Sequence, residues 1–221
     1  MQKLSSMISV LITRPRYDKA THYLYYWSEP LKKEAESKGY DVYDISKKKA
    51  SRKNVISFLN KHNPTVVIFN GHGSRDSVCG HDNEELIKAR QDSYLLKGKN
   101  IFIRACDCGK DLGPDAIQSG ATGFVGYKEP FIFFWDKEKF YHPLDDKVAA
   151  PFLESSNQVA ISLIKGHPAD YAHKASIKVY RKRLEEMLTS VSNSDKAWAL
   201  VWNMRNQVCY SEASKRESKK S

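Results

Sequence analysis

Apolar runs alternate with amphipathic stretches through the first 130 residues of the chain. The runs "VVIF" and "IFI" are apolar at every position, which is typical of strands buried on both faces of a parallel sheet. The intervening stretches place apolar residues three and four positions apart, as helices do. The predicted strands are 7–13, 40–45, 65–70, 100–105 and 121–127, and the predicted helices between them are 21–39, 51–63 and 83–90. This β-α-β order predicts an α/β fold with a mostly parallel central sheet and helices on both faces.

From about residue 150 the pattern is helical, over 150–166, 168–191 and 194–210. Trp198 and Trp202 lie one turn apart in the last stretch, which predicts that they pack in the helix core. The aromatic-rich segment 128–146 is aperiodic and fits either a loop over the sheet edge or the wall of a substrate cleft. We expect residues 1–210 to form one domain with a helical C-terminal portion. The polar, basic residues 211–221 are expected to form a disordered tail.

Composition narrows the class of protein. With 221 residues and 41% hydrophobic residues, the chain can form a globular core, which excludes a disordered protein. It has no apolar run near the ~20 residues that cross a bilayer, so we expect a cytoplasmic protein with no membrane contact. The net charge of +10 is spread over 46–53, 180–184 and 214–220. That spread favours a solvated surface over a nucleic-acid patch, although a basic module that binds nucleic acid or a signalling ligand is a third hypothesis.

Two consecutive predicted strands end in reactive residues. "TVVIFNGHGS" places His72 between Gly71 and Gly73, and "IFIRACDCG" places Cys106 just past the next strand. Ligands bind at the carboxyl ends of parallel strands, so neighbouring strands would bring thiol and imidazole to one rim. There a helix N-terminus or an imidazolium could lower the pKa of the Cys106 thiol. The backbone N–H groups of Gly73 and Cys106 could form an oxyanion hole, with His72 as the general acid for a leaving amine.

These two motifs resemble the signature of the caspase-like superfamily of cysteine peptidases, which includes caspases, legumain and the gingipains. In that signature an apolar strand ends in His-Gly, and the next ends in a small residue followed by Cys; the "GHGS" form is most similar to the gingipain-type branch. The resemblance implies a three-layer caspase-like fold and a cysteine endopeptidase that forms an acyl-enzyme through a Cys106–His72 dyad. It also implies oxyanion donation from Gly73 and Cys106, a protein or peptide substrate and no cofactor. By analogy with stand-alone microbial relatives, an activating partner protein is a further expectation.

Substrate preference is open at the level of the sequence. In the loop after the first strand, Arg14 and Arg16 suit an acidic substrate side chain, whereas Asp18 suits a basic one. All three are candidate substrate-binding residues. Cys108 follows the predicted nucleophile by two positions, and we interpret it as a neighbour.

Two alternatives to a peptidase are kept. One is a catalytically inactive relative that only binds or signals. The other is a zinc-binding domain, although the C-x-C spacing is tighter than structural zinc sites prefer, so we expect no metal. Its candidate ligands would be His72, Cys79, His81, Cys106 and Cys108.

Overall fold

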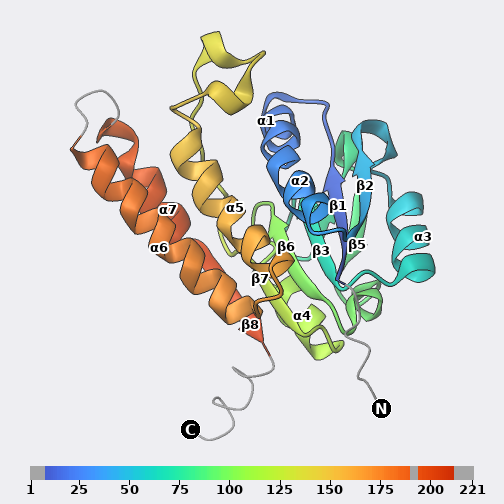
Figure 1. Cartoon of the computed structure of the whole chain (residues 1–221). Coiled ribbons are helices and arrows are strands. Elements are labelled where there is room, and N and C mark those ends of the chain that lie inside the picture. The colour runs from blue at the N-terminus through green and yellow to red at the C-terminus, as the bar shows by residue number, and fades with distance from the viewer. Residues whose placement is uncertain (1–7, 190–193, 212–221) are drawn as a thin grey trace, which may run out of the picture.

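A computed structural model describes residues 8–189 and 194–211, and its centre is a six-stranded sheet with the order β2-β1-β3-β6-β7-β8. The first five strands in this order are parallel, and β8 pairs antiparallel with β7. The short strands β4 and β5 form a separate antiparallel ribbon. The strands are β1 Ser9–Arg14, β2 Asp41–Ser46, β3 Val66–Asn70, β4 Ser77–Cys79, β5 Glu85–Lys88, β6 Asn100–Arg104, β7 Gly123–Tyr127 and β8 Gln207–Ser211. The predicted parallel α/β architecture is confirmed (Figure 1).

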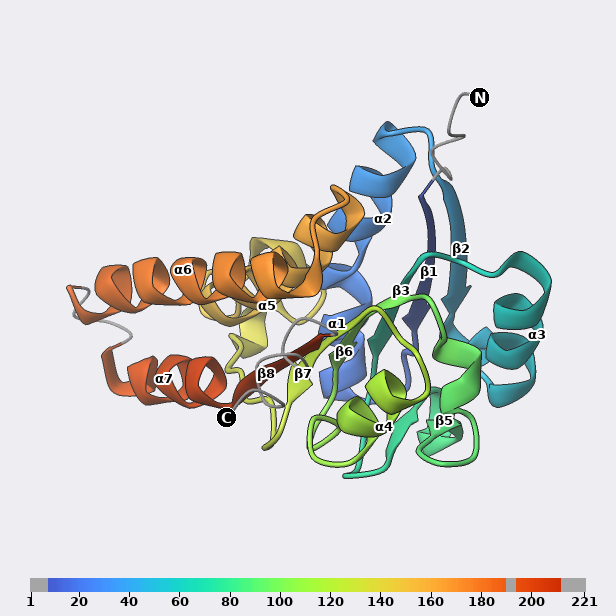
Figure 2. The ribbon, with the colours of Figure 1, turned by 90° about the horizontal axis from the view of Figure 1, so that it is seen from below.

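Helices cover both faces of the sheet, which gives three layers (Figure 2). Side chains alternate between the faces of a strand. In β3, Val67 and Phe69 pack with α3, α4 and the ribbon, whereas Val66 and Ile68 pack with α2, α5 and α6. The helices are α1 Lys19–Trp27, α2 Glu29–Ser37, α3 Arg52–His62, α4 Leu112–Gln118, α5 Ala150–Ile164, α6 Ala169–Leu188 and α7 Ala197–Asn206.

The first predicted helix is two helices, which meet at Ser28. Pro30 has no backbone N–H to donate to the carbonyl of Tyr26, so it ends one helix and begins the next. The start is also earlier than predicted, because Asp18 caps α1 by accepting from the Thr21 backbone in a capping box.

Two other segments differ from prediction. Residues 83–90 are not helical: β5 pairs with β4 there, and Leu86 and Ile87 are fully buried under the sheet. This tertiary burial outweighs the helix propensity of the segment. The last predicted helix ends at Asn206, and the chain continues as β8 through Ser211, where the predicted tail begins. The rest of the predicted tail, 212–221, lies outside the described residues.

The prediction that Trp198 and Trp202 lie in the helix core is wrong, because 52% and 36% of their surfaces are exposed. α7 buries a different face, and both rings contact the aromatic segment 128–146 instead. The Nε1–H of Trp202 donates to the carbonyl of Pro130 at 2.9 Å, and Trp198 meets the Phe134 ring edge-on. The aromatic segment therefore extends from α7 across to α1.

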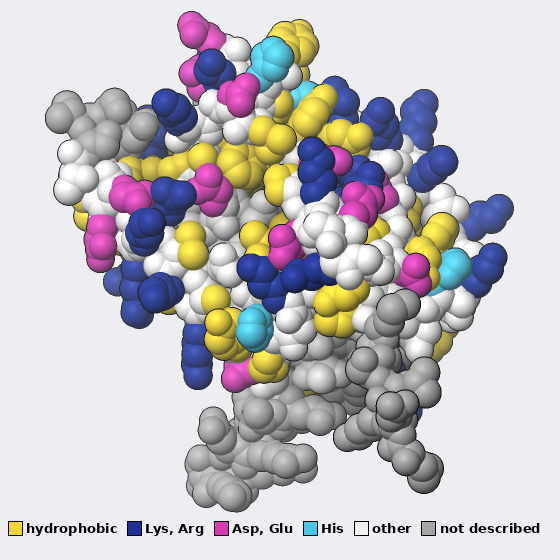
Figure 3. Space-filling view, viewed as in Figure 1, with side chains coloured by type: hydrophobic (Ala, Val, Ile, Leu, Met, Phe, Trp, Pro, Cys, Tyr) yellow, Lys and Arg dark blue, Asp and Glu magenta, His cyan; other side chains and the backbone are white. Residues whose placement is uncertain are grey.

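On the face in Figure 3, acidic and basic side chains are mixed over the centre, and basic side chains gather along the upper right edge. The longest described helix, α6, has 20 residues, but charged side chains occur along its length. None of the helices within 8–189 and 194–211 has the length and apolar character of a membrane span.

Candidate active site

Two central strands end at the residues that the sequence singles out. β3 and β6 pair in parallel, and Asn70 lies opposite Arg104 at the last position of each strand. His72 and Cys106 each follow two residues later. The loops that carry them therefore leave neighbouring strands at the carboxyl end of the sheet, where ligands bind in open α/β folds.

The two loops touch at Gly73. A Cβ atom on Gly73 would lie 2.8 Å from the carbonyl oxygen of Cys106 and 2.5 Å from the Sγ of Cys108. On the other side, the backbone N–H of Cys79 donates to the carbonyl of His72 at 2.9 Å, which ties the loop to β4. Only glycine allows this close approach.

His72 is held by a carboxylate. Its Nε2 lies 2.6 Å from Oδ2 of Asp18, and a little over a third of each side chain is exposed. An ionised carboxylate can only accept, so Nε2 carries a proton in this pair. The other ring nitrogen, Nδ1, has no hydrogen-bond partner among the described residues and is left to exchange a proton.

Asp18 is itself fixed by the start of α1. Its Oδ1 accepts from the backbone N–H of Thr21 at 2.7 Å. Burial acts to raise the pKa of Asp18, but hydrogen bonds from the Thr21 backbone and hydroxyl, and then from His72, outweigh it and lower the pKa. The carboxylate is therefore ionised at neutral pH.

Cys106 is partly buried beside the aromatic segment. Burial raises the pKa of its thiol, hydrogen bonding with the Phe131 backbone opposes this, and the Asp107 carboxylate raises the pKa further. The net direction is upward, opposite to the lowering expected from the sequence. One reason is that α4 begins only at Leu112, so no helix N-terminus adjoins the sulfur.

A tight turn follows Cys106. The backbone N–H of Cys108 donates to the carbonyl of Cys106 at 2.8 Å, and Asp107 between them has a φ of 61°. Such a left-handed residue is uncommon outside glycine, although Asp tolerates it better than most. A salt bridge of 2.7 Å to Lys110 holds the Asp107 side chain. The turn reverses the chain just after Cys106, which lies two residues past the end of β6.

The other three cysteine thiols are buried or partly buried. Cys108 is fully buried and donates to the carbonyl of Ser77 at 3.3 Å, and burial raises its pKa well above the ordinary value. Burial also raises the pKa of Cys79, and that of Cys209 to about 12. In the part of the chain that the structure describes, no three His, Cys, Asp or Glu side chains are grouped to hold a metal ion, which the zinc alternative requires.

The two arginines considered for substrate binding are engaged elsewhere. Arg14 is 3% exposed and forms ion pairs with Asp44 and Glu29. Arg16 donates to Nδ1 of His22 at 3.2 Å and stacks over the ring of Tyr26. Of the three candidates in this loop, only Asp18 lies beside His72.

A buried arginine supports the ends of the two central strands. Arg104 is fully buried, and its guanidinium donates to the side-chain oxygens of Asn70, Asn157 and Ser28. No carboxylate accepts from it among the described residues, and burial lowers its pKa to about 10. These bonds join β3 and β6 to α5 and to the α1–α2 junction, directly behind the two loops.

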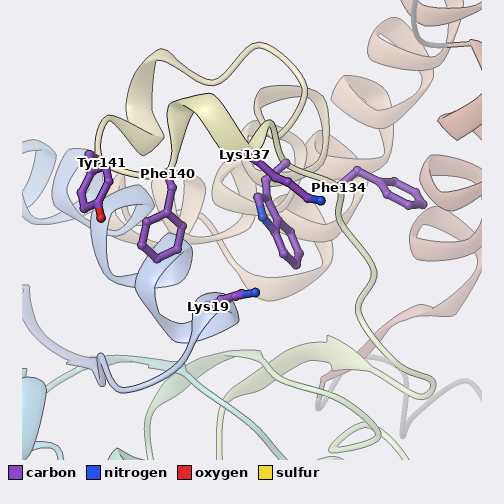
Figure 4. A pocket seen from close by; sticks show the side chains of 6 residues that line it. Lys19, Phe134, Lys137, Phe140 and Tyr141 are labelled. Atoms are coloured by element: carbon purple, nitrogen blue, oxygen red, sulfur yellow. The ribbon is translucent and has the colours of Figure 1, made fainter.

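A cavity of about 460 Å³ opens between the start of α1 and the aromatic segment (Figure 4). Two chain segments connect it to the site, because Lys19 follows Asp18 and Phe134 lies three residues after Phe131. Its lining residues are Lys19, Phe134, Trp135, Lys137, Phe140 and Tyr141.

The architecture is similar to that of solved gingipain structures. The complex of the pro- and mature domains of RgpB from Porphyromonas gingivalis matches 92% of this chain and 47% of its own, at 12% sequence identity and a TM-score of 0.57. The chain has the caspase-like fold. The Arg-specific cysteine proteinase gingipain R matches 82% of this chain and 44% of its own, with 14% identity and a TM-score of 0.49. The chain thus spans about half the length of these proteins. No protein-family model matches the sequence, and no curated protein is similar to it.

Within the caspase-like fold, sequence reasoning missed part of this site. It considered Asp18 for substrate binding, whereas the structure pairs this carboxylate with His72. The Asp18-x-x-Thr21 spacing is a capping signal, and it could have located Asp18 at the start of a helix near the strand ends. Lys19 and Lys137 carried no signal, because they come together only through the path of the aromatic segment.

Proposed function

We propose that the chain is a cysteine endopeptidase in which Cys106 is the nucleophile and His72 is the general acid and base. The proposal rests chiefly on one observation: two parallel strands in register lead into His72 and Cys106 at the same end of the sheet. The caspase-like fold supports it, and so does the Asp18 carboxylate on His72. Asp18 would orient the imidazole and stabilise its protonated form.

In this mechanism Nδ1 of His72 takes the proton from Sγ of Cys106 as the sulfur attacks the scissile carbonyl carbon. A carbon–sulfur bond forms, and the carbonyl oxygen becomes an oxyanion. The imidazolium then protonates the amine nitrogen as the carbon–nitrogen bond breaks, which leaves an acyl-enzyme. Water, deprotonated by His72, attacks the thioester and releases the acid, and the thiol regains its proton.

The oxyanion would be held by the backbone N–H groups of Gly73 and Cys106. Neither group donates a hydrogen bond to any described residue. By contrast, the carbonyl of His72 accepts from the backbone N–H of Cys79, and the carbonyl of Cys106 lies close to Gly73. Unpaired N–H groups on two touching loops are suited to a charge that develops in the transition state. The raised pKa of the Cys106 thiol is also compatible with a nucleophile that His72 deprotonates during attack.

The decisive experiment measures both labelling and cleavage. Iodoacetamide or a peptidyl electrophile should label Cys106, and mass spectrometry should locate the adduct. Labelling and cleavage of a fluorogenic peptide library should vanish in Cys106→Ala and fall sharply in His72→Ala. Cys79→Ala is the matched control, because Cys79 is a partly buried thiol on the adjoining ribbon with no proposed role.

Cleavage that persists in Cys106→Ala would refute the proposal. Labelling of Cys106 that is specific but unaffected by His72→Ala, together with no cleavage, would instead favour the inactive binding relative.

The wider role remains a set of predictions. We propose one catalytic domain over residues 1–210, a cytoplasmic location and a protein partner that activates the enzyme or is cleaved by it. A protein partner is consistent with the RgpB structure, in which a prodomain is bound to the mature domain.

A further inference from the structure

The cavity beside the proposed dyad combines aromatic walls with positive charge. Its walls are formed by Phe134, Trp135, Phe140 and Tyr141. Of the described residues that line it, only Lys19 and Lys137 are charged. In Figure 4 the two lysines lie on opposite sides of the space, one from the start of α1 and one from the aromatic segment. A ligand between them would meet ammonium groups from both sides.

Neither ammonium group is neutralised within the described part of the chain. Both Lys19 and Lys137 are exposed, and neither forms a salt bridge with another described residue. The adjacent carboxylates are engaged: Asp18 binds His72 and Thr21, and Asp136 caps the backbone N–H of Glu138. Among the described residues, the side chains that line the cavity therefore include two positive charges and no negative one.

The location ties the cavity to the reaction. Lys19 is adjacent in sequence to Asp18, and the Phe131 backbone that bonds to Cys106 continues into Phe134. A peptide whose scissile bond lay at Cys106 could therefore reach the cavity with a side chain near the cut.

We infer that this cavity is a specificity pocket for an acidic side chain of the substrate, with glutamate preferred to aspartate. The inference rests on the proposed peptidase function. The carboxylate would pair with Lys19 and Lys137, and the longer methylene stem of glutamate would contact the aromatic rings. A basic side chain would be repelled by both lysines.

The test compares fluorogenic peptides that differ only in Glu, Asp, Gln or Lys at each position around the cut. The ratio of kcat/KM for Glu over Gln is the readout, because it cancels general effects on catalysis. Exposed ion pairs are modest, so the wild type should prefer Glu at one position by roughly tenfold. Lys137→Glu should abolish this preference, and Lys19→Glu with Lys137→Glu should reverse it in favour of the Lys peptide.

Lys139→Glu is the matched control, because it makes the same charge change on an exposed residue of the same segment that does not line the cavity. It should leave the ratio unchanged. Equal cleavage of the Glu and Gln peptides at every position, or a preference that both pocket variants retain, would overturn the inference while the peptidase function stands.

Binding to the inactive Cys106→Ala protein separates the two claims. Fluorescence anisotropy should show that the Glu peptide binds more tightly than the Gln peptide, that Lys137→Glu weakens this binding, and that Lys139→Glu leaves it unchanged. Absence of cleavage by the wild type would contradict the proposed function. Absence of charge-selective binding to Cys106→Ala would contradict the acidic pocket.

Discussion

Asp18→Asn tests how much the carboxylate beside His72 contributes to catalysis. The change keeps the size of the side chain and its ability to cap α1, because Asn is as good an N-cap as Asp. It removes the charge from the 2.6 Å bond to Nε2. A hydrogen bond to a charged group contributes about 1.5–3 kcal/mol, and we reduce this to about 1–2 kcal/mol because over a third of each side chain is exposed.

That loss corresponds to a fall of roughly five- to thirtyfold in kcat, with little change in KM, since Asp18 acts through His72. Steady-state cleavage of the best library peptide measures it, and circular dichroism should show that the variant is still folded. An NMR measurement of the His72 ring protons supplies a second readout, because loss of the carboxylate should weaken the hydrogen bond that orders Nε2–H. Asp18→Ala is the comparison that also removes the cap, so it should lose about 1 kcal/mol of stability in addition.

The reasoning fails if Asp18→Asn retains full kcat while His72→Ala is inactive. In that case the hydrogen bond would position the helix and contribute nothing to the reaction. A change in KM without a fall in kcat would likewise contradict a role of Asp18 through the imidazole.

Further predictions concern the thiol, its glycine neighbour and the buried arginine. Because the Cys106 pKa is raised, its alkylation rate in His72→Ala should be low at neutral pH and climb only above the ordinary thiol value of about 8.5, as a pH series with iodoacetamide would show. Gly73→Ala places a methyl group against Cys106 and Cys108, so it should cost about 1–3 kcal/mol of stability in urea unfolding and reduce kcat at least tenfold even where the protein remains folded. Arg104→Met leaves the buried oxygen of Asn70 without its guanidinium donors, so the free energy of unfolding should fall by about 2–4 kcal/mol; unchanged stability would show that water or repacking replaces the network.

The Asp18 carboxylate also predicts that the free energy of unfolding decreases at acidic pH. Its pKa is lower in the folded than in the unfolded chain, so its contribution is complete above the unfolded value of about 3.9 and is lost as the pH falls through the folded value. Urea unfolding of wild type and Asp18→Asn should therefore converge toward low pH. A difference between the two that stays constant down to pH 2 would contradict the lowered pKa.

The parallel core was predictable because its strands carry a strong local signal. "VVIF" and "IFI" are too apolar for any exposed position, and each is bounded by polar or glycine-bearing turns. The ribbon strand β5 was not predictable in this way. Glu85–Lys88 has good helix formers, and only its pairing with β4 and the burial of Leu86 and Ile87 make it a strand.

The same distinction between local and long-range signals applies to the residues of the site. His72, Gly73 and Cys106 follow directly from strand ends, so a local pattern could locate them. The neighbours that set their chemistry come from distant parts of the chain: Asp18 from the start of α1 and Phe131 from the aromatic segment. No spacing rule relates residues that are this far apart in sequence, so the raised pKa of Cys106 could not be foreseen.

Burial of Cys106 and the charge on Asp18 act on opposite ends of the same proton transfer. Burial disfavours the thiolate, and the ionised carboxylate orients the imidazole, so the resting thiol is expected to be neutral and to transfer its proton as attack begins. As the carbon–sulfur bond forms, negative charge moves from the sulfur to the oxyanion. Gly73 and Cys106 are both partly buried, and hydrogen bonds from their N–H groups to a charge are stronger in such surroundings than in water. The surroundings that make the thiol a weak acid would therefore favour the transition state over the resting enzyme. On this proposal, a cysteine without a nearby helix N-terminus would still serve as the nucleophile.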